Sequence, residues 1–282
     1  MPRHPGTFFD AMATGYEALE PWYEHLYASL HALLRSEFTP PADAAEPRAL
    51  DAGCGTGFQT DILAGMGYTV HGLDLSRELL RAARERLDHA PLVQGDVQAL
   101  PYRDGSFEAA SCCGSTLSYV DDARQALAEI ARVLRPGGRL LIECEGRFSL
   151  DLGWAWLSGL FGDLLRYEVT PGAVWRAATT RRDRECRLAY PGYGTLRLFT
   201  VSELRRLLRA EGLDLLRVWG IHSITNVLPS TVLHRPRLGQ PLAAAYRILC
   251  RADRALCARW PAARLGNSLV LLGRKRSDEG RT

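Results

Sequence analysis

Short apolar segments alternate with longer amphipathic segments along most of the chain. From Arg48 onward, runs rich in aliphatic residues are separated by turns and by stretches with helical spacing. This alternation is typical of right-handed βαβ units and predicts a mainly parallel sheet. The expected strands are Arg48–Ala52, Thr69–Asp74, Pro91–Gly95, Ala109–Cys113, Arg139–Glu143, Leu213–Trp219 and Leu269–Arg274.

Three of the intervening segments have the pattern of helices that pack by one face. Ser76 can cap a helix whose apolar positions Leu79–Leu87 share a side. Asp122–Leu134 repeats the pattern and is followed by Pro136–Gly138, which ends a helix. Thr200 precedes the third such segment. We therefore expect an α/β fold of the Rossmann-like type, with a seven-stranded, mainly parallel sheet and helices on both faces.

Composition indicates a globular α/β protein and points to no charged partner. The 282 residues are 46% hydrophobic, which suits one α/β domain with insertions, and the net charge of +3 gives no reason to expect nucleic acid. The seven cysteines lie in apolar segments, and none of them forms a Cys-x-x-Cys pair. We therefore expect buried free thiols, no disulfide framework and no metal.

The amino terminus lacks the basic start and apolar run of a secretory signal, which favours a cytoplasmic protein. The most apolar stretch, Leu150–Leu165, is interrupted by Asp151 and Asp163 and is shorter than the roughly 20 residues that span a bilayer. This stretch could lie on a membrane but not cross one.

The strongest local motif is the glycine-rich segment Leu50–Gly57, which follows one expected strand and precedes a helix. Glycines there let the backbone approach a ligand, and Asp74 ends the next strand, where a carboxylate can accept hydrogen bonds from ribose hydroxyls. The Gly-x-Gly-x-Gly spacing differs from the dinucleotide fingerprint, and Asp51 would oppose a pyrophosphate. A nucleoside cofactor that carries an ammonium and a sulfonium group fits better than NAD.

Four motifs in order extend this pattern: Leu50–Gly57, Asp74, Gly95–Val97 and Leu134–Gly138. In these motifs the sequence resembles the class I S-adenosylmethionine-dependent methyltransferases, particularly the small-molecule branch of methyltransferase type 11 with its quinone and sterol methyltransferase relatives. The resemblance covers roughly Phe8–Trp219. It implies S-adenosyl-L-methionine as the cofactor.

The resemblance also assigns the cofactor-binding residues. The sequence departs from the family where Glu108 stands in place of the usual Asp, and where Cys112 and Cys113 replace small or polar residues. The assignments are Asp51, Gly53, Cys54, Gly55, Thr56 and Gly57 for the methionine end, Asp74 for the ribose, Leu75, Asp96 and Val97 for the adenine, Cys113 and Gly114 near the sulfonium, and Phe9, Tyr16 and Tyr23 of the leading helix as a cover.

The expected organisation follows from these assignments. Residues 1–47 would form a helical cap over the cofactor, and residues 48–145 the cofactor-binding core. Residues 146–198 would form a substrate lid, and residues 199–282 would complete the core around a helical insertion at about 221–266. Both insertions are rich in large apolar residues, which predicts a lid that excludes water from a small, apolar or aromatic acceptor.

Candidate catalytic bases are few. Glu143 and Glu145 flank a cysteine at the end of a strand, where alternation sends both carboxylates to one side, and Glu145 could take a proton from the acceptor. His222 and Tyr119 are weaker candidates, and all of these side chains could instead be structural or solvated. We interpret Cys112 and Cys113, next to Gly114, as buried residues and not as a reactive thiolate.

The expected reaction is in-line displacement of the cofactor's methyl group by an acceptor atom, with positioning supplying much of the rate. A nucleic-acid methyltransferase, a non-catalytic S-adenosylmethionine-binding module and an NAD oxidoreductase are alternatives. Cys112–Ser115 stands where amino-directed nucleic-acid enzymes carry an Asp- or Asn-Pro-Pro-aromatic motif. The arginine-rich passage Arg235–Arg264 is either a solvated face or a contact with an anionic membrane or acidic partner, and the oligomeric state stays open.

Overall fold

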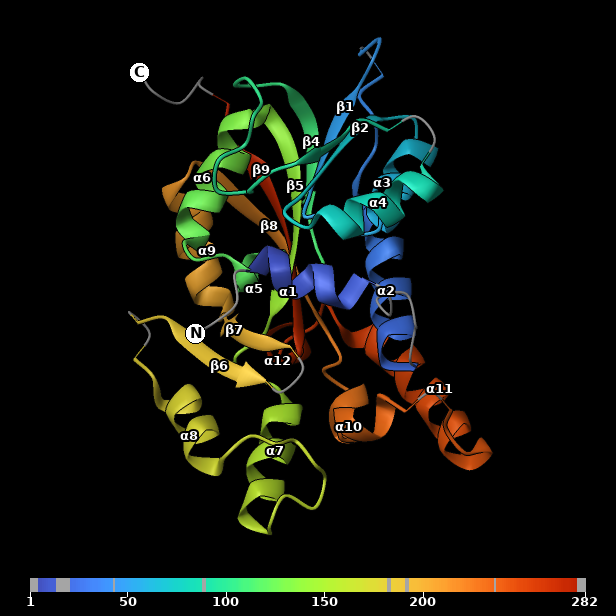
Figure 1. The fold of residues 1–282 in the computed structure, drawn as a ribbon, viewed down its shortest axis with the longest axis vertical. Coiled ribbons are helices and arrows are strands. Elements are labelled where there is room, and N and C mark those ends of the chain that lie inside the picture. Colours follow the sequence, from blue (N-terminus) through green and yellow to red (C-terminus); the bar gives the residue numbers. More distant parts are fainter. Residues whose placement is uncertain are drawn as a thin grey trace.

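The computed structural model describes residues 5–13, 21–42, 44–87, 90–181, 184–190, 193–235 and 237–277. Its centre is a seven-stranded sheet with helices on both sides (Figure 1). The helices are α1 Pro5–Met12, α2 Pro21–Glu37, α3 Phe58–Gly65, α4 Arg77–Arg86, α5 Thr116–Tyr119, α6 Ala123–Val133, α7 Leu150–Leu160, α8 Pro171–Thr179, α9 Val201–Ala210, α10 Ser230–Leu233, α11 Gln240–Leu256 and α12 Ala262–Leu265.

The sheet has the strand order β3-β2-β1-β4-β5-β9-β8. The neighbours from β3 to β5 pair in parallel, whereas β9 runs antiparallel between β5 and β8. The predicted fold class and all seven predicted strands are confirmed. The strands are β1 Arg48–Ala52, β2 Thr69–Asp74, β3 Leu92–Gln94, β4 Phe107–Cys112, β5 Leu134–Glu145, β8 Leu213–Ile221 and β9 Ser268–Lys275.

The start of β5 differs from the prediction. The strand was expected from Arg139, but it begins at Leu134, which pairs with Phe107 directly after α6 ends. The register then shifts before Arg139 pairs with Ala109, so the Pro-Gly-Gly segment forms an irregularity inside the strand. A Cβ on Gly138 would lie 2.8 Å from the carbonyl oxygen of Arg135, so this close approach requires glycine.

Each face of the sheet has its own apolar core. On one face α6 and α9 bury residues such as Leu127 and Leu204, and on the other α2 and α3 bury Leu30 and Leu63. The predicted cap at Ser76 is confirmed, since its side chain accepts a hydrogen bond from a backbone N–H group in the first turn of α4, and Asp122 and Thr200 cap α6 and α9 in the same way. The sheet is therefore held rigidly between two helical layers, with its strand ends exposed to a site.

The first insertion, after β5, forms α7, α8 and a hairpin of β6 Cys186–Tyr190 and β7 Gly194–Leu198, with an apolar cluster of its own. This hairpin was not predicted. The second insertion, after β8, contains α10, α11 and α12 and returns through β9. Among the described residues, none of the helices combines the length and apolar character needed to cross a bilayer.

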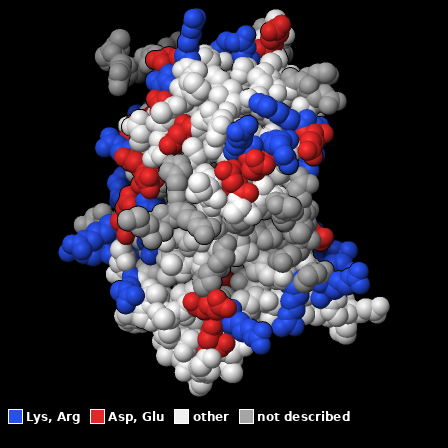
Figure 2. Space-filling model, in the orientation of Figure 1, with Lys and Arg blue, Asp and Glu red and all other residues white. Residues whose placement is uncertain are grey.

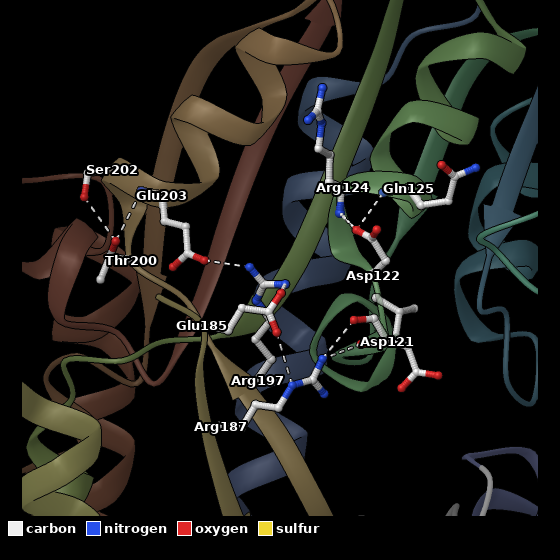
Figure 3. A network of polar contacts seen from close by, with 11 residues as sticks. Asp121, Asp122, Arg124, Gln125, Glu185, Arg187, Arg197, Thr200, Ser202 and Glu203 are labelled. Carbon is white, nitrogen blue, oxygen red and sulfur yellow. Dashed lines mark hydrogen bonds and ion pairs between the residues drawn. The ribbon is translucent and has the colours of Figure 1, made fainter. Parts of the chain in front are cut away.

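Arginines anchor the hairpin to the core (Figure 3). Arg187 donates to the carbonyl oxygens of Val120 at 3.3 Å and Asp121 at 2.9 Å, beside α5 and α6. Arg197 donates to the carboxylate of Glu203 on α9 at 2.8 Å, and both of these side chains are buried. The first insertion is therefore fixed to the sheet on two sides.

Candidate active site

The glycine-rich loop between β1 and α3 depends on left-handed backbone angles. Gly53, Gly55 and Gly57 have φ of +81°, +53° and +86°. A Cβ on Gly53 would lie 2.1 Å from Oγ1 of Thr116, at the start of α5. The loop therefore keeps its place against α5 only with glycine, and it leaves backbone exposed to the adjacent cleft.

Asp74, at the end of β2, closes one side of this loop. Its two carboxylate oxygens accept hydrogen bonds from the backbone N–H groups of Gly55 and Ser76, both at 2.8 Å. Burial raises the pKa of Asp74. Each carboxylate oxygen can accept a further hydrogen bond. The side chain is thus positioned by two backbone donors and can still accept from the two hydroxyls of a ribose.

Asp51, at the end of β1, lies buried behind the loop. Its oxygens accept from the hydroxyls of Thr60 on α3 and Ser111 on β4, each at 2.7 Å, and only 1% of the residue is exposed. Burial raises the pKa of Asp51 to about 6. This carboxylate braces the base of the loop and does not reach the wall of the cleft.

A narrow cleft lies where β1, β2 and β3 end, beneath α1. Leu75, Leu79, Val97 and Val120 give it apolar walls that suit a flat base. Asp96 lies at its edge, where its carboxylate accepts from Gln98. An apolar slot with one carboxylate for a diol and another at the base edge fits the nucleoside of S-adenosylmethionine.

The cleft gathers only part of the predicted cofactor-binding set. Cys113 turns its thiol into the core towards the carbonyl oxygen of Leu141, and its neighbour Gly114 lines the cleft instead. Tyr16 lies outside the described residues. Of the remainder, Gly53, Gly55, Asp74, Leu75, Asp96 and Val97 lie on the wall of the cleft, whereas Asp51, Cys54, Thr56 and Gly57 do not.

A larger cavity of about 1310 Å³ adjoins the cleft. The two share Phe9, Gly114 and Tyr119 in their walls, so Phe9 on α1 borders both. Both insertions contribute to the cavity. Its aromatic side chains are Phe9, Trp22, Tyr23, Tyr27, Tyr119, Tyr167, Tyr190, Tyr193 and His234.

Two carboxylates line this cavity near Gly114. Glu143 and Glu145 lie on the same side of β5, as predicted, and the hydroxyl of Ser115 lies 3.0 Å from Glu145 and 3.5 Å from Glu143. Glu143 also accepts from the backbone N–H of Ser115, and Asn267 donates to Glu145 at 3.1 Å. Burial, and then the negative charge of Glu143, raise the pKa of Glu145 to about 8.

The two other candidate bases differ in position. Tyr119 lines both the narrow cleft and the larger cavity, and its hydroxyl donates to the carbonyl oxygen of Tyr193. Burial raises the pKa of Tyr119. His222 does not line the cavity: it is fully buried, stacks on Trp22 with ring centroids 4.1 Å apart, and bonds to Thr225. Burial lowers the pKa of His222, which suits a neutral structural side chain.

Sequence reasoning missed several cavity residues, including Ser115, Asn267 and His234. They come from three separate segments and belong to no motif. Ser115 could have been suspected because it directly follows Gly114 at a strand end, where ligands bind in open α/β sheets.

Comparison with known proteins identifies relatives of this chain. A family model described as a methyltransferase domain matches residues 50–142. Malonyl-[acyl-carrier protein] O-methyltransferase from Methylococcus capsulatus is 30% identical over 247 residues, which cover 84% of this chain and 82% of that protein. Demethylmenaquinone methyltransferase from Corynebacterium kroppenstedtii is 35% identical over 145 residues, covering 51% of this chain and 60% of that protein. The chain spans 29% and 42% of the length of two other curated proteins that it matches, so it covers less than two thirds of these relatives.

Solved structures share the fold. A methyltransferase from Thermotoga maritima has a TM-score of 0.55 and 20% identity, covering 97% of this chain and all of that one. The 1,6-didemethyltoxoflavin-N1-methyltransferase of Burkholderia thailandensis, solved with S-adenosylhomocysteine, has a TM-score of 0.54 and 18% identity, covering 98% and 91%. Fold and site thus define a class I methyltransferase. The chain belongs to the S-adenosylmethionine-dependent methyltransferases, a family of enzymes.

Proposed function

We propose that the protein transfers a methyl group from S-adenosylmethionine to a hydroxyl group on a small aromatic acceptor. One observation carries the proposal: the nucleoside cleft and a large aromatic cavity share Phe9, Gly114 and Tyr119, and two glutamates stand beside this junction. The cofactor supplies a methyl group made electrophilic by its bond to a sulfonium. The seven cysteines, all free in the structure, favour a reducing compartment such as the cytoplasm.

The cofactor-binding role falls on the residues of the cleft wall. Asp74 would accept from the ribose hydroxyls, Leu75 and Val97 would pack on the adenine, and Asp96 would accept from its exocyclic amine. The loop at Gly53 and Gly55 would lie along the methionine end. Phe9 would close the site from above and keep water out.

The acceptor is inferred from the chemistry of the cavity. Six tyrosines and a tryptophan offer flat apolar faces with polar rims, which suits stacking of an aromatic ring that carries hydroxyls. A free carboxylate, such as that of a malonyl group, suits the inner end less well. At about 4 Å the negative charge of Glu143 would repel it by about 4 kcal/mol at an effective dielectric constant near 20. We therefore favour a phenol or quinol over a malonyl thioester.

Glu145 is the proposed proton acceptor. The acceptor's hydroxyl oxygen forms the new bond to carbon as the carbon–sulfur bond breaks, S-adenosylhomocysteine leaves uncharged, and the hydroxyl proton passes to the carboxylate of Glu145. Ser115 and Asn267 donate to this carboxylate and would fix its orientation. The side chain faces the cavity beside Gly114, where the acceptor must meet the methyl group.

The first test is binding of the cofactor. Calorimetry with S-adenosylmethionine should give micromolar affinity, and Asp74→Asn should weaken it at least about tenfold, because two charge-assisted hydrogen bonds are lost. Asp61→Asn is the matched control, since Asp61 is an exposed carboxylate on α3. Equal binding by both variants would contradict the assignment of the ribose site.

The second test is product formation. The protein is incubated with the cofactor and a panel of phenols, quinols, arylamines and malonyl thioesters, and methylated products and S-adenosylhomocysteine are measured by mass spectrometry. We expect turnover of hydroxylated aromatics. Turnover of malonyl thioesters alone would overturn the acceptor proposal, and cofactor binding without turnover of any acceptor would favour a non-catalytic module.

A further inference from the structure

Most of the large exposed apolar side chains lie in the two insertions. Of the thirteen large apolar side chains that are exposed among the described residues, twelve lie in residues 146–198 or 221–266. Leu216 on β8 is the exception. Single exposed apolar residues are ordinary, but a grouping of this kind marks a surface that contacts something.

Helix α7 presents the most continuous part of this surface. Leu150, Trp156, Leu157 and Leu160 are between 37% and 52% exposed. The only ionisable residue of the helix, Asp151, is buried. The outward face of α7 therefore carries no charged side chain, whereas the exposed face of a surface helix usually carries charged and polar residues.

The apolar surface continues beyond the end of α7. Phe161 and Leu164 are 64% and 77% exposed, and Trp175 on α8 is 61% exposed. In Figure 1, α7 and α8 form the lower end of the molecule, which projects away from the sheet. We call the side chains of Leu150, Trp156, Leu157, Leu160, Phe161, Leu164 and Trp175 the apolar tip.

Basic residues accompany the apolar tip. Residues 221–266 contain a single acidic residue, Asp253, which is buried and bonded to His25. Figure 2 shows Lys and Arg side chains at the lower right, over α11, and Asp and Glu side chains with a basic neighbour at the lower centre, above a lowest end that is uncharged. The exposed arginines of this insertion are Arg235, Arg237, Arg247, Arg251, Arg254, Arg259 and Arg264.

Hydrogen bonds join the two insertions into one end of the molecule. Trp154 on α7 donates to the carbonyl oxygen of Asn226 at 3.1 Å, and Asp151 accepts from both the N–H and the hydroxyl of Ser230 at 2.8 Å. The wall of the large cavity includes Leu164 from the loop after α7 and Arg235 after α10. The cavity is thus bordered by the apolar tip on one side and the basic insertion on the other.

We propose that this end of the protein docks on the surface of an anionic phospholipid bilayer. The apolar tip would enter the headgroup region, while the arginines of residues 221–266 contact lipid phosphates. The proposal also extends the proposed function, on which this part rests: the aromatic acceptor carries an apolar tail and enters the cavity from the bilayer. Leu164 and Arg235 would border its path.

A lipid surface fits these observations better than a protein partner. The tip is a projecting end rather than a groove, and its two exposed tryptophans, Trp156 and Trp175, are of the residue type enriched where protein meets headgroups. The adjacent insertion offers exposed positive charge without exposed acidic residues, which complements anionic lipid. A second copy of the chain would bring the same positive charge against itself.

The test is binding to vesicles, which needs no acceptor and no turnover. The full chain is mixed with vesicles of phosphatidylcholine alone or with vesicles that also contain about 30% phosphatidylglycerol, an anionic lipid that gives a negative surface potential. Bound protein is separated by flotation. We expect binding that rises with phosphatidylglycerol and falls with added salt. Protein that stays free of both kinds of vesicle overturns the proposal.

Matched variants locate the surface. Leu160→Glu should reduce binding at least about tenfold, because a charge enters the headgroup boundary, whereas Leu216→Glu, at a leucine 42% exposed outside the insertions, should not. Arg247→Glu should lower binding to the phosphatidylglycerol vesicles by about fivefold or more, and Arg81→Glu on α4 should leave it unchanged. Equal effects within either pair would overturn the proposal, as would a dimer that Leu160→Glu dissociates.

The outcomes separate this proposal from the proposed function. Vesicle binding without methyl transfer to any acceptor would keep the docking surface and reject the function. Methyl transfer to water-soluble phenols without vesicle binding would keep the function and reject the docking surface.

Discussion

The side chain of Glu145 gives the most direct test of the chemistry. Burial and the charge of Glu143 raise its pKa to about 8. Glu145 is therefore mostly protonated at pH 7 and mostly ionised at pH 9. If ionised Glu145 takes the acceptor's proton, kcat should rise about tenfold between these two pH values.

The substitution Glu145→Gln keeps the shape and removes the base. We expect kcat at pH 9 to fall by roughly 10² to 10⁴, which is the usual contribution of a general base, and the rise with pH to disappear. The assay is initial-rate formation of S-adenosylhomocysteine from pH 6 to 10 with a phenolic acceptor whose own pKa lies above 10. Glu85→Gln, at an exposed glutamate on α4, is the control.

The same variant has a second, independent signature in stability. For an acid with a raised pKa, the folded state favours the protonated form, so stability is lost as pH rises from about 4.5 towards 8. Glu145→Gln removes this loss. It should therefore be more stable than the native protein at pH 9, by at most about 5 kcal/mol for the full shift, and equally stable at pH 4.

Two results would refute this reasoning. A rate that keeps its full pH dependence in Glu145→Gln would show that another group takes the proton. If the variant is no more stable than the native protein at pH 9, ionisation of Glu145 does not lower the free energy of unfolding. Water would then solvate this carboxylate in the cavity.

Three other substitutions test the frame of the site. Gly53→Ala should destabilise the protein by about 1–3 kcal/mol and weaken cofactor binding, because its φ is +81° and its Cβ would meet Thr116; unchanged thermal melting and calorimetry would contradict this. Asp253→Ala removes a buried acceptor of four hydrogen bonds, which should cost about 3 kcal/mol of stability and lower the melting temperature by about 6–12 °C. A calorimetric melting temperature within about 2 °C of the native value, roughly the shift for 1 kcal/mol, would contradict this. Asp10→Ala frees α1 from the hydroxyl of Ser76 and should speed release of S-adenosylhomocysteine in stopped flow, while an unchanged rate would show that α1 does not gate the cleft.

The sheet could be predicted because its signals are local. Each strand is an apolar run followed by turn residues, and the caps at Ser76, Asp122 and Thr200 follow from short-range hydrogen bonding. The hairpin of β6 and β7 was missed because its strands carry Arg187 and Arg197, which pair with the core rather than with water. Tertiary contacts decided those strands, and a sequence pattern does not show them.

The predicted residues that lie on the cleft wall belong to a loop and to strand ends that local sequence specifies. Gly53 and Asp74 lie on the cleft wall because the loop and strand end are fixed by local geometry. Asp51 was assigned to the cofactor by resemblance to the family, and that assignment stays a prediction; the structure adds its hydrogen bonds to Thr60 and Ser111, which no motif shows. The acceptor side depends on how the two insertions fold against each other, which residue spacing alone does not specify.

The bonds between the insertions bear on how such an enzyme can be re-engineered. Asp151 and Trp154 of the first insertion are held by Ser230 and Asn226 of the second. A chimera that exchanges only the second insertion would leave the buried Asp151 with the hydroxyl of Tyr167 but without the two donors of Ser230. Exchange of the first insertion alone would remove the acceptor of Ser230. Acceptor preference should therefore transfer only when both segments are exchanged together, as one paired cassette on an unchanged sheet.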